Sequence, residues 1–319
     1  MVHHAVVGVD AGGTSTRCAV VSLSGEVLAC SRTGGANLFS GSDPAAAVEA
    51  ALGSALEEAG DTVVDGGVFG IAGAASAGYT EAVRTVSRVW AVLGLTGTPH
   101  VTDDIAVAFA SGSAASAGTV LIAGTGAVAA VVRDGAVVRR CDGYGWLLGD
   151  EGSAVWIALA GLRSVLAAID GRGRPTVLGD RLAEALKVTP GDARQIVRAV
   201  HSRPPAELGA LAPEVTLAAS GGDAVAEGIV ADAAARLLTN LESVAPRPMG
   251  TAPVVLAGAL LAGGPVADAV QAGLRARHGV AALSATDGAA GAAGLALRRA
   301  GASSAAHSAL LAAANTPMR

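Results

Sequence analysis

The chain of 319 residues is long enough for one large domain, and we favour two domains of ordinary size. Hydrophobic residues make up 51% of it and aromatic residues only 3%, so the core must be built from Ala, Val and Leu. A net charge of −5 without a basic stripe argues against a nucleic-acid partner. Charge, Gly or Pro interrupts each Ala-rich run before it could span a bilayer, so we expect no membrane partner.

The first 110 residues alternate strand-like and helical segments. An apolar run from Ala5 to Val9 ends at Asp10. The pair Asp43-Pro44 is typical of an N-cap and the first residue of a helix, which we expect to end near Glu58. Further strands are expected at 18–23, 26–30, 63–71 and 100–102, and further helices at 80–89 and from the Asp pair at 103–104 to about 110.

The opening pattern returns after a small, polar segment at 111–118, which is the best candidate for a domain boundary. A strand, a turn at 124–126, a second strand, a hairpin turn at Asp134-Gly135 and a third strand repeat the earlier order. Two such halves facing each other would hold a phosphate chain between two sets of turn amides. Strands are expected here at 119–123, 127–132, 136–140 and 253–256, and helices through most of 153–244, after Gly264-Pro265 and at 288–300.

The loop after the first strand contains a glycine pair, Gly12-Gly13, between Asp10 and two threonines, Thr14 and Thr16. The glycines permit positive φ and let backbone N–H groups approach phosphate oxygens, and the threonine hydroxyls add donors. Asp10 could hold Mg²⁺ through water. An ordinary hairpin turn explains the loop equally well by itself. It is neither a Walker A loop, since Gly-Lys-Ser/Thr is missing, nor a dinucleotide fingerprint, since a strand follows.

Two consecutive carboxylates, Asp103 and Asp104, follow an expected strand end, where open α/β sheets place groups that face ligands. One could take a proton from an attacking hydroxyl, as in phosphoryl transfer. A capping Asp at the start of the next helix is the common alternative. Two in succession allow one to cap and the other to act, and we favour Asp104 as the base, partly because of the family resemblance described below.

The most informative segment is the acidic turn at 149–153, Gly-Asp-Glu-Gly-Ser, which precedes an apolar helix. Its carboxylates are placed where a polyhydroxylated ligand could dock. We expect Asp150 to contact the ligand and Glu151 to favour the positive end of the helix. Asn37 lies in a glycine-rich loop and offers a donor and an acceptor for sugar hydroxyls, although loop Asn residues are mostly turn formers.

Together these segments resemble the N-acetylglucosamine kinase family of the sugar-kinase/actin-like ATPase superfamily, which is grouped with the activating ATPases of benzoyl-CoA and 2-hydroxyacyl-CoA reductases. The resemblance covers nearly the whole chain, and the intact acidic turn at the right distance after Gly124-Thr125-Gly126 is its most specific part. It implies an α/β fold of two actin-like lobes, duplicated ribonuclease H-like domains, with a central nucleotide and sugar cleft. The N-terminal lobe would be 1–115, with 301–319 packing back on it, and the C-terminal lobe 116–300.

The resemblance also implies ATP and Mg²⁺ as cofactors and an amino sugar as substrate. Asp104 would take the proton of the 6-hydroxyl, which attacks the γ-phosphate. The substrate-binding residues that it implies are Asn37, Asp104, Asp142, Gly143, Tyr144 and Asp150. The nucleotide-binding residues are Gly12, Gly13, Thr14, Thr16, Gly124, Thr125, Gly126, Gly258 and Ala259, and the metal-binding residue is Asp10.

The segment before the acidic turn departs from the family. Members often carry Gly-Gly-Trp-Gly where this chain has Asp142-Gly143-Tyr144-Gly145, and in the acetylated-sugar kinases this segment lies by the 2-acetamido group. A carboxylate at 142 could face a free 2-ammonium instead, or be a solvated loop residue, which we favour slightly. Ala127 stands at the position after Gly124-Thr125-Gly126 where family members often have a Ser, so one possible hydroxyl donor is absent. We expect N-acetylglucosamine as substrate, with glucosamine or another sugar or cyclitol as alternatives.

Two other classes and the location complete the expectations. A reductase-activating ATPase needs cysteines near the second phosphate loop, where this chain has Ile122-Ala123. A non-catalytic sugar sensor has no need of the base Asp104. The odd number and wide spacing of Cys18, Cys30 and Cys141 fit a reducing compartment. The N-terminal residues lack the positive region of a signal peptide, so we expect a cytoplasmic protein, with a homodimer left open.

Overall fold

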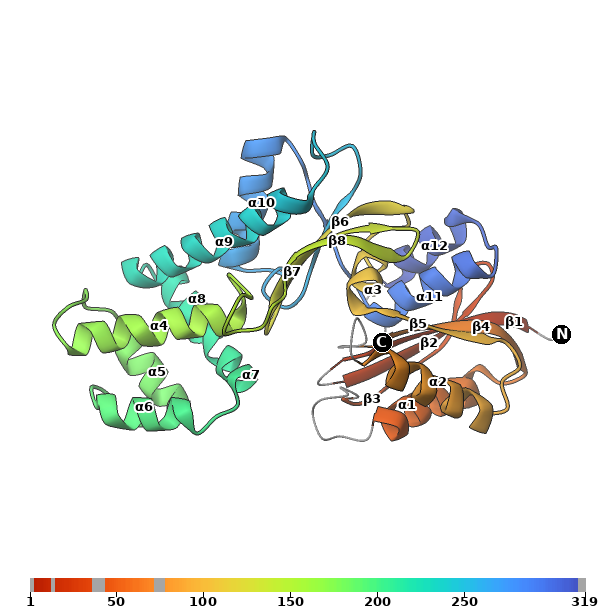
Figure 1. Ribbon diagram of the computed structural model, residues 1–319, viewed down its shortest axis with the longest axis horizontal. Helices are drawn as coiled ribbons and strands as arrows, with labels where there is room; N and C mark the ends of the chain where they lie inside the picture. The colour runs from red at the N-terminus through yellow and green to blue at the C-terminus, as the bar shows by residue number, and fades with distance from the viewer. Residues whose placement is uncertain (1–2, 13–14, 36–43, 72–77, 315–319) are drawn as a thin grey trace. The chain divides into compact units, whose positions relative to one another are not determined.

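The computed structural model describes residues 3–12, 15–35, 44–71 and 78–314 (Figure 1). Contacts divide the chain into two compact units, the first with residues 1–118, 131–138 and 283–319 and the second with 119–130 and 139–282. The boundaries expected from the sequence lie at 115 and 300. By its contacts, the segment between 283 and 300 joins the first unit, as do residues 131–138.

A five-stranded mixed sheet forms the centre of the first unit (Figure 1). Its order is β3-β2-β1-β4-β5, in which β3, β2 and β1 pair antiparallel, and β1, β4 and β5 pair in parallel. Residues Ala5 to Val9 are all buried, as is usual for a strand covered on both faces. The strands are β1 (His3–Ala11), β2 (Ser15–Ser22), β3 (Val27–Gly34), β4 (Thr62–Ile71) and β5 (Thr98–Asp103).

Helices cover both faces of this sheet. The core that α1 and α2 share with the sheet includes Val7 and Val9, while Gly8, between them, points to the other face and contacts the backbone of α11 at Ala289 and Ala293. A side chain at Gly8 would collide with that helix, so glycine permits the close approach. The helices of this unit are α1 (Pro44–Ala59), α2 (Tyr79–Val92), α3 (Asp104–Ala110), α11 (Gly288–Arg299) and α12 (Ser304–Ala314).

The second sheet repeats the strand order of the first. Its order is β10-β9-β6-β7-β8, so in each sheet three consecutive strands are followed outward by two strands that come later in the chain. The internal repeat predicted from the two glycine turns is therefore confirmed, and with it an α/β fold built from duplicated halves. The strands are β6 (Ala117–Ala123), β7 (Ala127–Arg133), β8 (Ala136–Asp142), β9 (Val254–Ala257) and β10 (Leu283–Ser284).

Most helices of the second unit lie between β8 and β9 in the chain, and α10 follows β9. The longest helix, α9 (Ala224–Val244), packs against α4, α8 and α10. Asp223 caps α9 by accepting hydrogen bonds from Val225 and Ala226. The other helices are α4 (Ala154–Ile169), α5 (Leu178–Leu186), α6 (Ala193–His201), α7 (Pro205–Leu208), the 3₁₀ helix η1 (Gly209–Leu211), α8 (Ala212–Ser220) and α10 (Pro265–His278).

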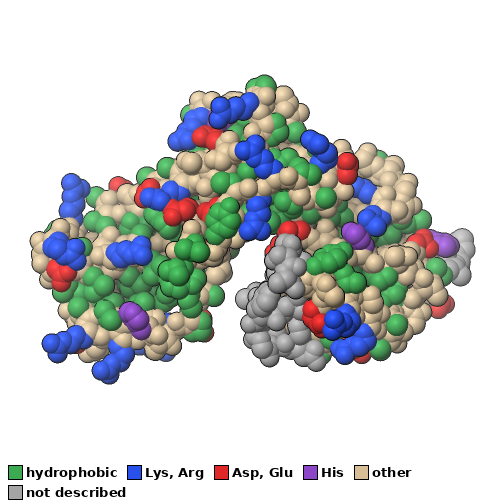
Figure 2. Space-filling view, in the orientation of Figure 1, with side chains coloured by type: hydrophobic (Ala, Val, Ile, Leu, Met, Phe, Trp, Pro, Cys, Tyr) green, Lys and Arg blue, Asp and Glu red, His purple; other side chains and the backbone are tan. Residues whose placement is uncertain are grey.

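The surface carries charges of both signs. Figure 2 shows Lys and Arg side chains dispersed over the visible face, with Asp and Glu side chains between them. In the part of the chain that the structure describes, no helix is both long and apolar enough to cross a membrane.

Candidate functional site

The first unit places the two consecutive aspartates in different roles. Asp103 is the N-cap of α3, and its carboxylate accepts a hydrogen bond from the backbone N–H of Ile105 at 2.9 Å. Asp104 is the first residue of the helix and is partly buried. The capping alternative therefore applies to Asp103, which leaves the carboxylate of Asp104 for other work.

The surroundings of Asp104 oppose its ionisation. Burial raises its pKa well above the usual range of an aspartate, and a hydrogen bond with Asp103 and the negative charges of Asp103 and Asp10 act in the same direction. The N–H group of Ile105 opposes this to a lesser degree. A carboxylate whose pKa is moved toward neutrality is suited to accept a proton near physiological pH.

Asp10, at the end of β1, lies beside the first turn of α11. Its carboxylate packs so closely on Gly288 that any side chain there would collide with it. Burial and the negative charge of Asp287 raise the pKa of Asp10 to about 6, and Arg17 acts in the opposite direction. Arg17 pairs with Asp287 at 3.3 Å, and Asp287 also caps α11.

The sequence reasoning missed Asp287 and Arg17 as neighbours of Asp10. The signal for Asp287 is the Asp-Gly pair in front of an Ala-rich helix, which is typical of an N-cap. Nothing in the sequence places this cap next to Asp10, because the two are 277 positions apart in the chain. That proximity depends on the packing of α11 against β1.

The carboxylates around Asp10 fit the ligand chemistry of Mg²⁺. Asp10 and Asp287 supply hard oxygen donors, and the carboxylate of Asp10 is buried and lies near the negative charge of Asp287. Over the described residues, no group of three or more His, Cys, Asp and Glu side chains is arranged to hold a metal ion. An ion here would take most of its ligands from water and phosphate oxygens, as Mg²⁺ does in phosphoryl-transfer enzymes.

The first glycine turn is only partly described. Gly13, Thr14 and Asn37 lie outside the described residues. The N–H group of Gly12 donates to the carbonyl of Ser15 at 3.0 Å, which closes the turn. Thr16 is fully buried in β2, and its hydroxyl has no hydrogen-bond partner among the described residues. In this conformation its hydroxyl is covered by protein, so its expected role as a phosphate donor does not fit its burial.

The second glycine turn is tied to two other segments of the second unit. The N–H group of Gly124 donates to the carbonyl of Gly126 at 2.9 Å, and the carbonyl of Gly124 accepts from Ala154 at the start of α4 at 2.8 Å. Gly258 has φ +91° and lies against the backbone of Ala123, where a Cβ atom would collide. These contacts hold the turn, the start of α4 and the segment after β9 together.

A cavity of about 470 Å³ opens beside this turn. Its size falls in the range of small-molecule sites. Small residues dominate its wall, so a flat, apolar group can approach the backbone closely. The lining residues are Gly124, Thr125, Ala154, Ala206, Gly209, Ala210, Ala212, Pro213, Thr216, Ala259, Leu260, Gly263, Gly264, Pro265 and Val266.

The acidic turn meets the second glycine turn within the same unit. Asp150 has φ +54°, and its carboxylate lies so near Gly126 that a Cβ atom there would be 2.8 Å from Oδ2. Burial and the charge of Asp142 raise the pKa of Asp150, while the N–H groups of Ala127 and Gly145 lower it. Two motifs that are 24 positions apart in sequence thus form one polar surface.

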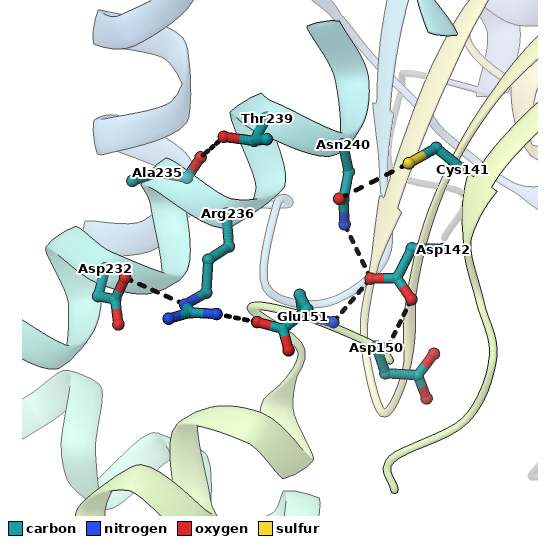
Figure 3. Close-up of polar contacts among 9 residues, drawn as sticks. All are labelled: Cys141, Asp142, Asp150, Glu151, Asp232, Ala235, Arg236, Thr239 and Asn240. Atoms are coloured by element: carbon teal, nitrogen blue, oxygen red, sulfur yellow. Dashed lines mark hydrogen bonds and ion pairs between the residues drawn. The ribbon is translucent and has the colours of Figure 1, made fainter. Parts of the chain in front are cut away.

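Asp142 differs most from expectation. Only 5% of it is exposed, so the solvated-loop interpretation is wrong. Its carboxylate accepts from the backbone N–H groups of Asp150 and Glu151 and from the side-chain amide of Asn240 (Figure 3). It also accepts from the backbone N–H group of Gly143. A carboxylate offers about four lone-pair positions, and these four donors occupy them. In this conformation the carboxylate of Asp142 has no acceptor position left for a sugar, so the expected sugar contact does not fit its hydrogen bonds.

The remaining residues of this segment have mixed surroundings. Glu151 forms an ion pair with Arg236 of α9, and Ser153 caps α4 by accepting from Trp156 at 3.2 Å. Tyr144 is 66% exposed, with the guanidinium of Arg140 5.9 Å from its ring centre, so its ring is available for stacking.

The second unit therefore brings together Gly124, Thr125, Gly126, Gly143, Tyr144, Asp150, Gly258 and Ala259, and the first unit brings together Asp10 and Asp104.

Comparison with known proteins shows which family and which named relatives the chain resembles. The model of the BadF/BadG/BcrA/BcrD ATPase family matches residues 7–296. An N-acetylmuramic acid/N-acetylglucosamine kinase of Clostridium acetobutylicum is 26% identical over 243 residues, which are 75% of this chain and 78% of that protein. An N-acetyl-D-glucosamine kinase of Dictyostelium discoideum is 32% identical over 193 residues, which are 57% of this chain and 60% of that protein.

Solved structures share the fold. A Chromobacterium violaceum protein, provisionally assigned as an N-acetylglucosamine kinase, aligns with a TM-score of 0.75 at 24% identity. The alignment covers 92% of this chain and 99% of that protein. The family resemblance and the two-lobed actin-like α/β architecture predicted from the sequence are thereby confirmed.

Proposed function

This chain belongs to the BadF/BadG/BcrA/BcrD ATPase family, and from that premise we propose that it transfers the γ-phosphoryl group of ATP to the 6-hydroxyl of an amino sugar. The protein is an ATP-dependent sugar kinase, the class of its named relatives. The finer proposal is N-acetylglucosamine as acceptor and N-acetylglucosamine 6-phosphate as product, with glucosamine second. Its cytoplasmic location and a homodimer stay predictions.

The observation that carries the proposal is the junction of the acidic turn with the second glycine turn. Asp150 presents a carboxylate next to Gly126, and the cavity beside Gly124 and Thr125 has the size and lining of a nucleoside site. A group that binds hydroxyls and a turn that binds phosphate are then neighbours. Such a neighbourhood is needed when a sugar hydroxyl attacks a phosphate.

The proton of the attacking hydroxyl goes to Asp104 in this proposal. The O6–H bond breaks toward the carboxylate as O6 bonds to the γ-phosphorus, and the bond from that phosphorus to the β-γ bridging oxygen breaks to release ADP. The raised pKa of Asp104 supports this role, because a base with a pKa closer to that of its proton source accepts more readily. The protein otherwise acts by positioning the reactants.

Asp10 and Asp287 are proposed to hold Mg²⁺ through its water ligands. Bound there with ATP, the ion would supply positive charge for the phosphate oxygens. Arg17 keeps Asp287 oriented through their ion pair. On the sugar side, Asn37, Gly143 and Tyr144 stay proposed contacts beside Asp150, and Gly12, Gly13 and Thr14 stay proposed phosphate contacts.

A coupled ADP-release assay tests the acceptor. It compares N-acetylglucosamine, glucosamine, N-acetylmannosamine, N-acetylmuramic acid and glucose, with sugar omitted as the blank. We expect N-acetylglucosamine to stimulate ADP formation most, and phosphorus–proton correlation NMR of the product to place the phosphate on C6. If no amino sugar stimulates ADP formation, or the phosphate is on another carbon, the proposal fails.

A further inference from the structure

The buried carboxylate of Asp142 is the best-satisfied charged group near the acidic turn. Its Oδ1 accepts from the N–H groups of Gly143 at 2.8 Å and Asp150 at 2.7 Å. Its Oδ2 accepts from the N–H group of Glu151 and from Nδ2 of Asn240, both at 2.8 Å. A buried charge is costly unless it is fully hydrogen-bonded, and these four donors meet that need.

The backbone that these bonds hold is unusual. Asp142 has φ +67° and Asp150 has φ +54°, both in the left-handed region that side chains seldom adopt. Such conformations persist where surrounding interactions over-determine them. The carboxylate of Asp142 also packs on Gly149, where any Cβ atom would collide with it. The turn is thus wrapped around one carboxylate.

Helix α9 holds this assembly from one side (Figure 3). Asn240 donates to Asp142, and Arg236, one helical turn earlier, pairs with Glu151. Arg236 is also held by Asp232 and lies 4.9 Å from the ring centre of Trp156. Two side chains of α9 therefore contact the two ends of the segment from Asp142 to Glu151, which contains Asp150.

We propose that Asp142 and Asn240 are positioning residues, which fix the acidic turn so that Asp150 presents its carboxylate to the sugar. This inference rests on the proposed function for the identity of the sugar. Neither residue touches the sugar in the proposal. They act through the N–H groups of Asp150 and Glu151, whose positions set the direction of the Asp150 side chain.

Direct recognition of a free amine by Asp142 is the competing account, and the two differ in selectivity. If the carboxylate of Asp142 binds the 2-ammonium group, Asp142→Asn should weaken the binding of glucosamine much more than that of N-acetylglucosamine. If the carboxylate positions the turn, the variant should weaken the binding of both sugars equally, because both depend on Asp150. Asp142→Asn keeps the shape but replaces one acceptor oxygen with an amide that cannot accept from Glu151.

The test measures KM for sugar and for ATP in Asp142→Asn and Asn240→Ala. Thr239→Ala is the matched control, since Thr239 is an exposed neighbour on α9 whose hydroxyl bonds only to the carbonyl of Ala235 among the described residues. We expect the sugar KM to rise about tenfold or more in both variants. Asp142→Asn removes an acceptor of these hydrogen bonds, and Asn240→Ala removes one donor to a buried charge. ATP KM should stay within about twofold in both, and both constants should stay at the wild-type value in the control.

Hydrogen exchange of the segment 143–153 gives a readout that does not depend on the substrate. Protection of the Asp150 and Glu151 amides should fall in Asp142→Asn and Asn240→Ala and stay unchanged in Thr239→Ala. The double variant Asp142→Asn with Asn240→Asp restores one Asn–Asp hydrogen bond, so its sugar KM should lie below that of Asn240→Asp alone, where two carboxylates face each other.

The outcomes separate the two proposals. A wild-type enzyme that ignores every amino sugar overturns the proposed acceptor, while the exchange data still judge the positioning role. Wild-type exchange and an unchanged sugar KM in both variants would overturn the positioning role alone. Selective loss of glucosamine in Asp142→Asn would overturn it in favour of direct recognition.

Discussion

At the scale of single residues, the two consecutive aspartates at the start of α3 differ in their surroundings. Asp103 is used by the helix end, whereas Asp104 lies in surroundings that disfavour its charge. A residue whose charged form is disfavoured by its surroundings in the fold is a candidate for function. The pair Asp10 and Asp287 repeats this pattern at the start of α11.

Asp104→Asn should abolish most of the activity. An amide cannot accept the hydroxyl proton, so we expect kcat to fall by roughly 10² to 10⁴, with little change in the KM of either substrate. Steady-state kinetics with the coupled assay measure this, and Asp103→Asn, which can still cap α3 through its amide oxygen, is the control. Full turnover in Asp104→Asn would show that another group takes the proton.

The pH profile should reflect the raised pKa of Asp104. A base acts in its ionised form, so kcat/KM for sugar should rise with pH through a range above that of an ordinary aspartate. Bound Mg²⁺ and substrate set the final value in the complex, so kcat and kcat/KM are both recorded. An acid limb at the usual aspartate pKa near 4 would contradict this assignment.

Asp10 links pH to stability. The pKa of Asp10 in the folded protein, about 6, exceeds its ordinary value of 3.8, so the folded state holds this proton more tightly than the unfolded chain. The protonated carboxyl group of Asp10 therefore stabilises the folded state fully below about pH 4, and this contribution is lost as pH rises through 6. Asp10→Asn should match the wild type at pH 4 and be more stable at pH 8, by roughly 1 to 2 kcal/mol after allowance for solvent screening.

Thermal unfolding without Mg²⁺ across this pH range measures the effect. The difference in Tm between the variant and the wild type should widen with pH. Added Mg²⁺ should narrow it at pH 8 if the ion binds beside Asp10, because the ion compensates the negative charge. A constant difference at every pH would show that ionisation of Asp10 is not the cause.

At the scale of elements, close backbone approaches shape the cavity that we propose for the nucleotide. Gly258, just after β9, combines a positive φ with contact on the backbone of Ala123, directly before the second glycine turn. The segment after it reaches the cavity through Ala259 and Leu260. Strand β9 therefore determines where this wall of the cavity lies.

Gly258→Ala should be costly. The methyl group meets backbone that cannot yield easily, and the positive φ adds strain, so we expect a loss of about 1 to 3 kcal/mol of stability and a higher KM for ATP. Gly228→Ala in α9 is the control, since its site is exposed and open and the change should stabilise the helix by up to about 1 kcal/mol. Equal effects of the two changes on ATP KM would contradict the account.

At the scale of the whole molecule, the strand order is repeated in two sheets that carry different candidate site residues. Both sheets have the same strand order, yet the first carries the carboxylates Asp10 and Asp104 and the second carries the cavity and the acidic turn. Nucleotide binding should therefore protect the second unit at 120–130 and 257–268 in hydrogen exchange with Mg-ADP. Protection confined to other segments would place the nucleotide elsewhere.

The sequence by itself determined most elements, because strand and helix periodicities and turn residues are local signals. Expected helices such as 80–89 and strands such as 63–71 agree with α2 and β4 within a few residues. The glycine turns, the Asp pair and the acidic turn could also be recognised from the sequence, since each is a short motif with its own chemistry.

Only the tertiary structure decided which side chains meet. The neighbourhood of Asp10 and Asp287 arises from packing between segments far apart in the chain, and the hydrogen bond from Asn240 converts Asp142 from an expected surface or ligand group into a buried one. Burial and hydrogen-bond saturation depend on all neighbours at once, and a sequence pattern states only the neighbours along the chain.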